Sequence, residues 1–369
     1  MKITLERAEL VRALAHVHRV VERRNTIPIL ANVLLRAGKN GLELKATDLD
    51  LEIVETVPAE IKQASAVTVP AHMFYDIVRK LPEGSQVELQ SGTDRGSVQV
   101  RAGRSRFTLQ TLPETDFPDI AAGDLPHRFK LAAGDLKRLV DKTQFAISTE
   151  ETRYYLNGIY LHLVDDKKLR AVATDGHRLA QVDLPAPKGA AGMPGVIVPR
   201  KTVAEVQRLL EDAGEEVEIE LSPAKIRFSL GKVVLTSKLI DGTFPDYGRV
   251  IPLGNDKILV VDKGEFSSAV DRVSTVSSER GRAVKLSLGN GKLTLSVTNP
   301  DSGSATEEIE VEYGAEPIDI GFNSRYLLDI AQQIEGEKAT LKLADPGSPT
   351  LLQDSEPSGA LYVLMPMRV

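Results

Sequence analysis

The sequence predicts an α+β fold in which one domain is repeated three times, each copy with two helices packed on antiparallel sheet. A short segment recurs nearly unchanged, as LELKATDL at 42–49, LRAVATDG at 169–176 and LTLSVTNP at 293–300. Measured between Asp48, Asp175 and Asn299, the copies lie 127 and 124 residues apart. A period this long is the size of a whole domain and exceeds the repeat length of solenoid proteins.

A second recurring segment keeps the same spacing and has helical periodicity. It reads VPAHMFYDIVRKLPEG at 69–84, VPRKTVAEVQRLLEDAGEE at 198–216 and FNSRYLLDIAQQIEGEK at 322–338. A third links only the first two copies, as DFPDI at 116–120 and TFPDYGRV at 243–250. We therefore expect domains at 1–124, 125–252 and 253–369, with boundaries in polar stretches that contain Gly or Pro.

Each copy is expected to run helix, strands, helix, strands. The opening helices are predicted at 7–20, 134–147 and 263–276, because apolar residues recur there at helical spacing. Alternating segments that follow predict strands, with a hairpin turn at Lys39, Asn40 and Gly41 in the first copy. The second helices are predicted at 70–81, 199–210 and 323–334. Two helices beside antiparallel strands indicate an α+β layer arrangement.

Composition excludes several classes of protein. The chain of 369 residues is 42% hydrophobic, so each third is able to bury a core. It has no cysteine, which excludes disulfides, thiolate nucleophiles and cysteine-based zinc sites. No run of 18 apolar residues predicts a membrane span, and the beginning MKITLERAEL lacks the pattern of a signal peptide. We therefore expect a cytoplasmic protein.

Charge is distributed unevenly along the chain. The formal net charge is −6, yet the six predicted helices sum to +6. Helices in general favour Lys and Arg, and this alone accounts for such a bias. The other interpretation places the helices on the inside of a ring of repeats, where their cations contact DNA phosphates without reading bases. An acidic outer surface would then discourage DNA from binding outside the ring.

Nine segments together resemble the bacterial sliding clamps, the beta subunits of DNA polymerase III, over the full length of the chain. They are TIPILANVLL (26–35), TVPAHMFYDIVRKLPEG (68–84), GRSRFTLQTLP (103–113), RYYLNGIY (153–160), VATDGHRLA (172–180), VPRK (198–201), TSKLIDGTFPDY (236–247), GFNSRYLLD (321–329) and YVLMPMRV (362–369). The resemblance implies a head-to-tail homodimer, a closed ring of six domains that encircles duplex DNA and slides along it. The ring tethers the polymerase, makes and breaks no bond, and needs no cofactor.

The resemblance also implies partners and a hydrophobic pocket that receives their peptides. The partners are the replicative polymerase alpha subunit, the clamp loader delta subunit, and other polymerases and repair proteins with clamp-binding peptides. The matching pocket positions are Leu156, Thr174, Gly176, His177, Arg178, Leu179, Pro245, Arg249, Val250, Asn323, Tyr326, Val363, Leu364, Met365, Pro366, Met367 and Arg368. Methionines on both sides of a proline suit an adaptable apolar wall. Gly281 stands where a related clamp has phenylalanine, so we expect one looser wall.

Two further sets of residues follow from the resemblance. It points to DNA contact by Arg24, Arg153, Tyr154 and Tyr155. Basic helix residues add diffuse positive potential, namely Arg7, Arg12, Lys80, Lys137, Arg138, Arg200 and Lys201. At the ring seam we expect Arg104 and Arg106 to oppose Glu307 and Glu308 across paired strand edges, with Phe107 and Leu109 as the apolar centre.

Two other functions stay open on the sequence. Asp175 and His177, two residues apart, are compatible with a hydrolase, although a catalytic triad needs a nucleophile and a metal site needs more ligands. The other is a clamp-like paralogue specialised in protein interaction or drug tolerance, which keeps the ring and differs in pocket specificity.

Overall fold

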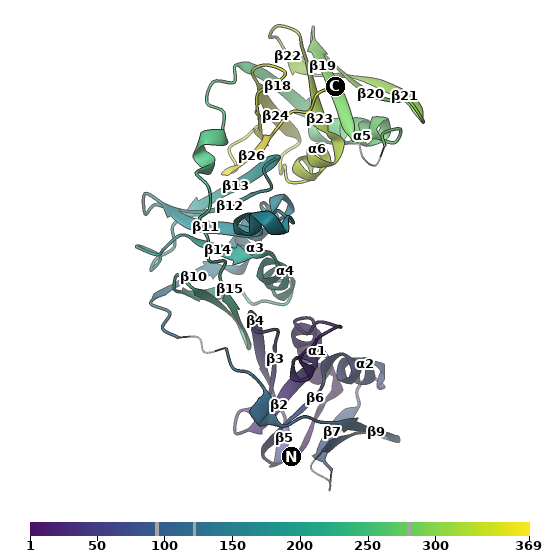
Figure 1. Ribbon diagram of the computed structural model, residues 1–369, viewed down its shortest axis with the longest axis vertical. Coiled ribbons are helices and arrows are strands. Elements are labelled where there is room, and N and C mark those ends of the chain that lie inside the picture. The colour runs from purple at the N-terminus through teal and green to yellow at the C-terminus, as the bar shows by residue number, and fades with distance from the viewer. Residues whose placement is uncertain (93–95, 121–122, 279–281) are drawn as a thin grey trace. The chain divides into compact units, whose positions relative to one another are not determined.

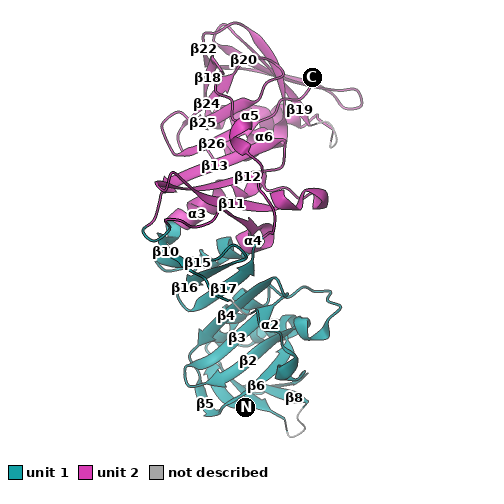
Figure 2. Ribbon diagram, turned by 60° about the vertical axis from the view of Figure 1, so that its left-hand side comes forward, with its two compact units in different colours: residues 1–134, 188–190, 204–239 teal, residues 135–187, 191–203, 240–369 magenta. Residues whose placement is uncertain are grey.

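The computed structural model describes residues 1–92, 96–120, 123–278 and 282–369, and it consists of helices packed on antiparallel sheets (Figure 1). Its residues form two compact units (Figure 2). Unit 1 contains residues 1–134, 188–190 and 204–239, and unit 2 contains residues 135–187, 191–203 and 240–369. The units do not follow the three sequence repeats, because the middle repeat contributes to both. The predicted domain boundaries therefore stay a prediction.

Unit 1 contains two antiparallel sheets. The five-stranded sheet has the order β5 (Glu60–Gln63), β1 (Lys2–Glu6), β7 (Gln86–Ser91), β8 (Ser97–Ala102) and β9 (Ser105–Gln110). The eight-stranded sheet has the order β10 (His127–Ala132), β15 (Glu216–Leu221), β16 (Lys225–Leu230), β17 (Val233–Lys238), β4 (Leu51–Val57), β3 (Gly41–Thr47), β2 (Asn32–Gly38) and β6 (Ser65–Pro70). Because β17 pairs with β4, placing Leu235 opposite Ile53, this sheet joins the first two repeats.

The helices of unit 1 confirm the predicted periodicity. α1 (Arg7–Val17) and α2 (Ala71–Lys80) lie side by side, and α1 packs on β3 and β4 (Figure 1). The buried side of α1 carries Leu10, Leu14 and Val17, which recur at helical spacing. Burial of this apolar stripe, more than intrinsic propensity, holds the helix on the sheet.

The recurring TD or TN dipeptide forms the same hairpin turn in all three repeats. The side-chain oxygens of Asp48, Asp175 and Asn299 each accept a hydrogen bond from the backbone N–H two residues ahead, at 3.0, 2.9 and 3.0 Å. Such side-chain-to-backbone bonds favour Asp and Asn in turns. The following residue has a positive φ in two copies, 80° at Leu49 and 87° at Gly176. The repeat seen in the sequence is therefore a turn that local chemistry specifies.

His16 links the first two repeats inside unit 1. Its Nδ1 lies 2.7 Å from Oε2 of Glu55, and its Nε2 lies 3.2 Å from Oδ2 of Asp212. Glu55 is buried, at 2% exposed. Burial lowers the pKa of His16, but the hydrogen bonds and charges of Glu55 and Asp212 outweigh it and leave the pKa raised. The protonated imidazole thus neutralises a carboxylate that is hidden from water.

We expect the stability of the wild type to fall as the pH rises above neutrality, relative to a His16→Gln variant. A raised folded pKa stabilises the folded state fully below the unfolded pKa, near 6.5, and this contribution is lost as pH rises through the folded value. The loss is on the order of 1 kcal/mol, the net contribution of a typical hydrogen bond. Urea unfolding of both proteins at several pH values measures it; parallel stability curves would contradict the assignment.

Unit 2 also contains two antiparallel sheets. The nine-stranded sheet has the order β14 (Val196–Pro199), β11 (Gly158–Val164), β12 (Lys168–Thr174), β13 (Arg178–Pro185), β26 (Ala360–Leu364), β25 (Thr350–Asp354), β24 (Lys338–Leu343), β18 (Lys257–Asp262) and β22 (Glu312–Tyr313). The four-stranded sheet has the order β21 (Gly303–Glu310), β20 (Lys292–Asn299), β19 (Ala283–Gly289) and β23 (Ile318–Asn323). The nine-stranded sheet joins strands of the second and third repeats.

Helices α5 (Lys263–Ser274) and α6 (Ser324–Ala331) pack together in unit 2, and α5 lies on β20 and β21. The remaining helices are α3 (Ala133–Asp141) and α4 (Arg200–Leu209). The prediction of one helix over 134–147 was wrong at its end, because α3 stops at Asp141 and a separate 3-10 turn covers Gln144–Ala146. There Thr143 donates to the carbonyl of Leu139. Among the helices of the described residues, none combines the length and the apolar composition that a membrane span requires.

Candidate partner-binding site

The C-terminal strand brings the end of the chain to the TDGHR turn of the second repeat. β26 pairs antiparallel with β13, which places Val363 opposite Leu179. The ladder continues past β26, because the backbone N–H of Met365 donates to the carbonyl of His177 at 2.9 Å. Two segments nearly 190 residues apart in sequence therefore form one wall of the candidate site.

A buried apolar cluster lies beneath this wall. It consists of Leu156, Val172, Leu179, Ile197, Phe244, Leu351 and Val363. Of the residues predicted to line the pocket, Leu156, Leu179 and Val363 are in this cluster, and Leu364 is fully buried as well. These four are thus mostly buried positions that support the site.

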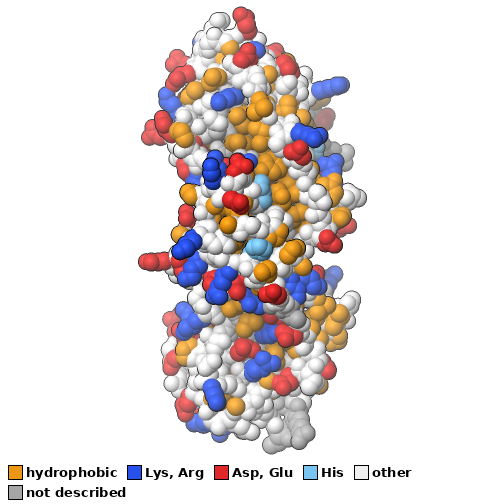
Figure 3. Space-filling model, turned by 90° about the vertical axis from the view of Figure 1, so that its left-hand side faces the viewer, with side chains coloured by type: hydrophobic (Ala, Val, Ile, Leu, Met, Phe, Trp, Pro, Cys, Tyr) orange, Lys and Arg blue, Asp and Glu red, His pale blue; other side chains and the backbone are white. Residues whose placement is uncertain are grey.

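Other predicted pocket residues lie at the surface of unit 2. Pro245, Arg249 and Val250 are exposed, in and beside the 3-10 turn Tyr247–Val250. At the chain end, Met365 and Met367 are 39% and 37% exposed. The tail is also fixed, since the N–H of Met367 donates to the carbonyl of Gly321 at 2.7 Å, while Pro366 is half-buried and Arg368 exposed. Hydrophobic side chains gather on the upper part of the face in Figure 3, which belongs to unit 2.

Arg178 connects three elements of unit 2. Its Nε lies 3.2 Å from Oδ2 of Asp175, its Nη1 pairs with Asp329, and its Nη2 donates to the carbonyl of Phe145 at 2.7 Å. The guanidinium also stacks 4.2 Å from the ring centroid of Tyr326. An arginine held by two carboxylates and an aromatic face is rigid. It therefore fixes the turn against α6.

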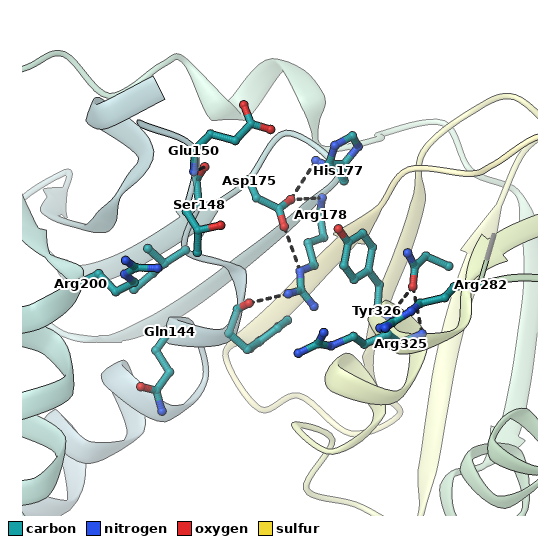
Figure 4. Close-up of a pocket in the computed structure, with 14 residues that line it drawn as sticks. Gln144, Ser148, Glu150, Asp175, His177, Arg178, Arg200, Arg282, Arg325 and Tyr326 are labelled. Atoms are coloured by element: carbon teal, nitrogen blue, oxygen red, sulfur yellow. Dashed lines mark hydrogen bonds and ion pairs between the residues drawn. The ribbon is translucent and has the colours of Figure 1, made fainter. Parts of the chain in front are cut away.

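Beside Arg178 is a pocket of about 600 Å³ (Figure 4). Four predicted residues line it: His177, Arg178, Asn323 and Tyr326. Asn323 also caps α6, because its Oδ1 accepts from the backbone N–H of Arg325 at 3.0 Å. Three cations that were not assigned to the peptide site share the lining, namely Arg200, Arg282 and Arg325. The lining of this pocket is mainly polar and basic.

The turn geometry leaves no catalytic pair at Asp175 and His177. Oδ1 of Asp175 accepts from the backbone N–H groups of His177 and Arg178, and its other oxygen faces the Arg178 guanidinium. Thr174 accepts from the N–H of Gly176 at 3.1 Å and donates to the carbonyl of Arg178 at 2.7 Å. Within the described ranges, no group of three or more His, Asp or Glu side chains is arranged to hold a metal. These residues build a turn, which argues against the hydrolase.

The residues predicted to contact DNA differ in how free they are. Arg24 and Tyr154 are exposed, whereas Tyr155 packs against the apolar cluster. Arg153 lies 3.2 Å from Glu150, and Lys137 pairs with Asp141. Arg138 is engaged more fully: it pairs with Glu335 and donates to the carbonyl of Ser358. Arg138 therefore stabilises a contact inside unit 2. Arg200 is an exposed pocket residue, and Lys201 has a partner of its own.

The predicted seam residues lie on two edge strands. β9 is an edge of the five-stranded sheet, and β21 is an edge of the four-stranded sheet. On β9, Phe107 is 36% exposed while Leu109 is only 4% exposed. Leu109 thus belongs mainly to the core of unit 1, contrary to its predicted place at the seam centre. Arg106 is exposed, and Arg104 lies in the turn before β9.

The acidic seam residues already have partners within the chain. Glu307 accepts from Nε of Arg272 at 3.0 Å, and Glu308 lies 2.6 Å from Nζ of Lys292. Gly281, predicted to loosen a pocket wall, lies outside the described residues. Sequence reasoning missed Phe244 and Tyr247, although they belong to the recurring FPD segment, and it missed Arg282 and Arg325.

Comparison with known proteins gives the same assignment along the whole chain. Three family descriptions match: DNA polymerase III beta subunit, N-terminal domain, at residues 1–121; central domain, at 130–246; and C-terminal domain, at 248–368. The beta sliding clamp of Caulobacter vibrioides is 56% identical and that of Pseudomonas aeruginosa 42% identical, each over all of both chains. A crystal structure of a sliding clamp from Bartonella birtlesii bound to griselimycin is 58% identical, with a TM-score of 0.97 over all of both chains.

Proposed function

This chain belongs to the family of bacterial sliding clamps, the beta subunits of DNA polymerase III, and from this premise we propose that two copies join head to tail into a closed ring around duplex DNA. As a sliding clamp it is a non-catalytic processivity subunit of the polymerase. The observation that carries this conclusion is the 56% sequence identity to the Caulobacter vibrioides sliding clamp over the full length of both chains. We place the ring in the cytoplasm, where bacterial DNA is copied.

Complementary sheet edges support the ring. Edge strand β9 presents Arg106 and Phe107, with Arg104 in the turn before it, and edge strand β21 presents Glu307 and Glu308. An unpaired edge is a template for another strand. If β9 of one copy pairs with β21 of the other, the same contact forms twice and the ring closes by symmetry. Arg272 and Lys292 then share their carboxylates with arginines across the seam.

Basic helices support sequence-independent contact with the duplex. The six predicted helices sum to +6, and Arg24, Arg153 and Tyr154 add exposed groups. Weak and redundant phosphate contacts hold the ring on DNA without fixing its position. We assign the polymerase alpha subunit, the clamp loader delta subunit and repair polymerases to the surface formed by the 240–251 segment and residues 365–368, where Val250, Met365 and Met367 are exposed. When the polymerase is tethered to this surface, its rebinding to the DNA becomes an intramolecular step.

A primer-extension assay on a long single-stranded circle tests the function. Polymerase III core, a bacterial clamp loader and ATP are supplied with or without this protein, and a trap captures polymerase that dissociates. We expect the products made in one binding event to be at least ten times longer with this protein. A tethered polymerase rebinds at a high effective concentration and does not have to return from solution. Products of equal length with and without the protein, in a reaction that a known sliding clamp stimulates, would overturn the assignment.

A further inference from the structure

The polar pocket beside Arg178 contains two cations that its own carboxylates do not neutralise. Asp175 pairs with Arg178, and Glu150 pairs with Arg153, so both acidic residues of the lining are already engaged. Arg200 and Arg325 have no ion-pair partner among the residues that the structure describes. Their side chains come from opposite sides of the pocket (Figure 4). The described lining of this pocket therefore carries excess positive charge.

The location and size of this pocket indicate which kind of ligand enters it. His177, Asn323 and Tyr326 line it, and the chain segment of His177 also holds Met365 through the 2.9 Å backbone bond. The pocket therefore lies beside the turn whose backbone holds Met365, one of the exposed methionines assigned to partner peptides. A duplex is a rigid rod that reaches only the rim of a 600 Å³ pocket, whereas side chains of an extended peptide enter it. Guanidinium groups bind carboxylates in a planar, two-pronged geometry.

We propose that this pocket recognises acidic residues that flank the apolar anchors of a partner peptide. The inference rests on the proposed function and deepens it by adding a charge requirement. Arg200 and Arg325 bind the flanking carboxylates. Arg178 is held by Asp175 and Asp329, and its guanidinium stacks on Tyr326 and fixes the position of that ring in the pocket. Partners with acidic flanks then bind more tightly than partners with the same anchors alone, and salt weakens the difference.

Two fluorescent peptides test the proposal. Both carry the same apolar clamp-binding anchors; one is flanked by Asp and Glu, and the other by Asn and Gln. We expect the full-length wild type to bind the acidic peptide about tenfold more tightly at low salt, the combined effect of two exposed charge pairs. The double variant Arg200→Gln with Arg325→Gln should bind both peptides with the affinity of the wild type for the neutral one. Lys167→Gln is the control, since it removes a cation from an exposed turn outside the lining.

The outcomes separate this inference from the function on which it rests. Equal wild-type affinities for the two peptides, or an acidic preference that survives in the double variant, would overturn the inference and leave the clamp function standing. Failure of the wild type to bind either peptide would overturn both. If the double variant loses affinity only for a single-stranded oligonucleotide, the pocket is a DNA site and the peptide inference is wrong. Circular dichroism of each variant checks that the fold is intact.

Discussion

Phe107→Asp is expected to convert the dimer into monomers. Phe107 lies on edge strand β9 and is partly exposed in the single chain, so its ring is available to the facing strand of the second copy. A carboxylate there is desolvated when the seam closes and finds no cationic partner in the apolar centre. We expect the dimer dissociation constant to rise at least about 100-fold, the effect of losing one central interface residue. Light scattering across a concentration series measures the mass, 40.2 kDa for one chain.

The matched control is Gln63→Asp, which adds the same charge on β5 at the opposite edge of the same sheet. It should leave the dimer unchanged. Leu109→Asp is a poor test, because Leu109 is buried in unit 1 and a charge there unfolds the domain whatever the seam does. Adding Glu307→Arg to Arg106→Glu should restore a dimer that Arg106→Glu weakens. A Phe107→Asp protein that associates like the wild type would remove β9 from the seam.

Met365→Asp is expected to weaken binding of partner peptides by about 100-fold while the dimer stays intact. Met365 is exposed beyond the end of β26, and its backbone is held by His177. A flexible thioether contacts the apolar anchors of different peptides equally well, whereas a carboxylate must lose its hydration to do so. The side chain is outside the buried cluster, so the substitution should change stability by less than about 0.5 kcal/mol. Fluorescence anisotropy with the neutral-flank peptide measures the affinity.

Met73→Asp provides the control for Met365, since Met73 is an exposed methionine on α2 in unit 1. It makes the same chemical change away from the candidate site and should leave peptide affinity unaltered. Equal losses in both variants would indicate a general effect of charge. Unchanged affinity in Met365→Asp would remove the chain end from the binding surface.

Local chemistry explains why the sequence predicted the repeated elements well. The helices carry their apolar residues at helical spacing, and the TD and TN dipeptides form a turn through bonds to backbone two residues ahead. These signals involve neighbours in the chain. The C-terminal end of α3 was harder to predict, because the apolar pattern continues past it without interruption. The hydrogen bond from the Thr143 hydroxyl to the carbonyl of Leu139 lies at this end and is not visible in that pattern.

Contacts between distant residues could not be predicted in this way. The pairing of β17 with β4 and of β26 with β13 makes the sheets continuous across repeats, and alternation along one strand does not name its neighbour. Arg138 was predicted to contact DNA, yet it pairs with Glu335, which lies 197 residues away. Leu109 and Phe107 are two residues apart on β9 and therefore lie on the same face of the strand. Packing within unit 1 buries Leu109 and leaves Phe107 partly exposed, and the sequence pattern does not distinguish the two.

Retention on circular and linear DNA tests the closed ring most directly. The labelled protein is loaded onto a nicked plasmid by a bacterial clamp loader and ATP, freed of excess by gel filtration, and then treated with an enzyme that cuts the plasmid once. A ring that holds DNA by topology stays on the circle in high salt and slides off the ends after cutting. We expect this loss from the cut plasmid, and blocking both ends with bound protein should prevent it. Retention on linear DNA with open ends, or salt-sensitive release from the uncut circle, would contradict the closed ring.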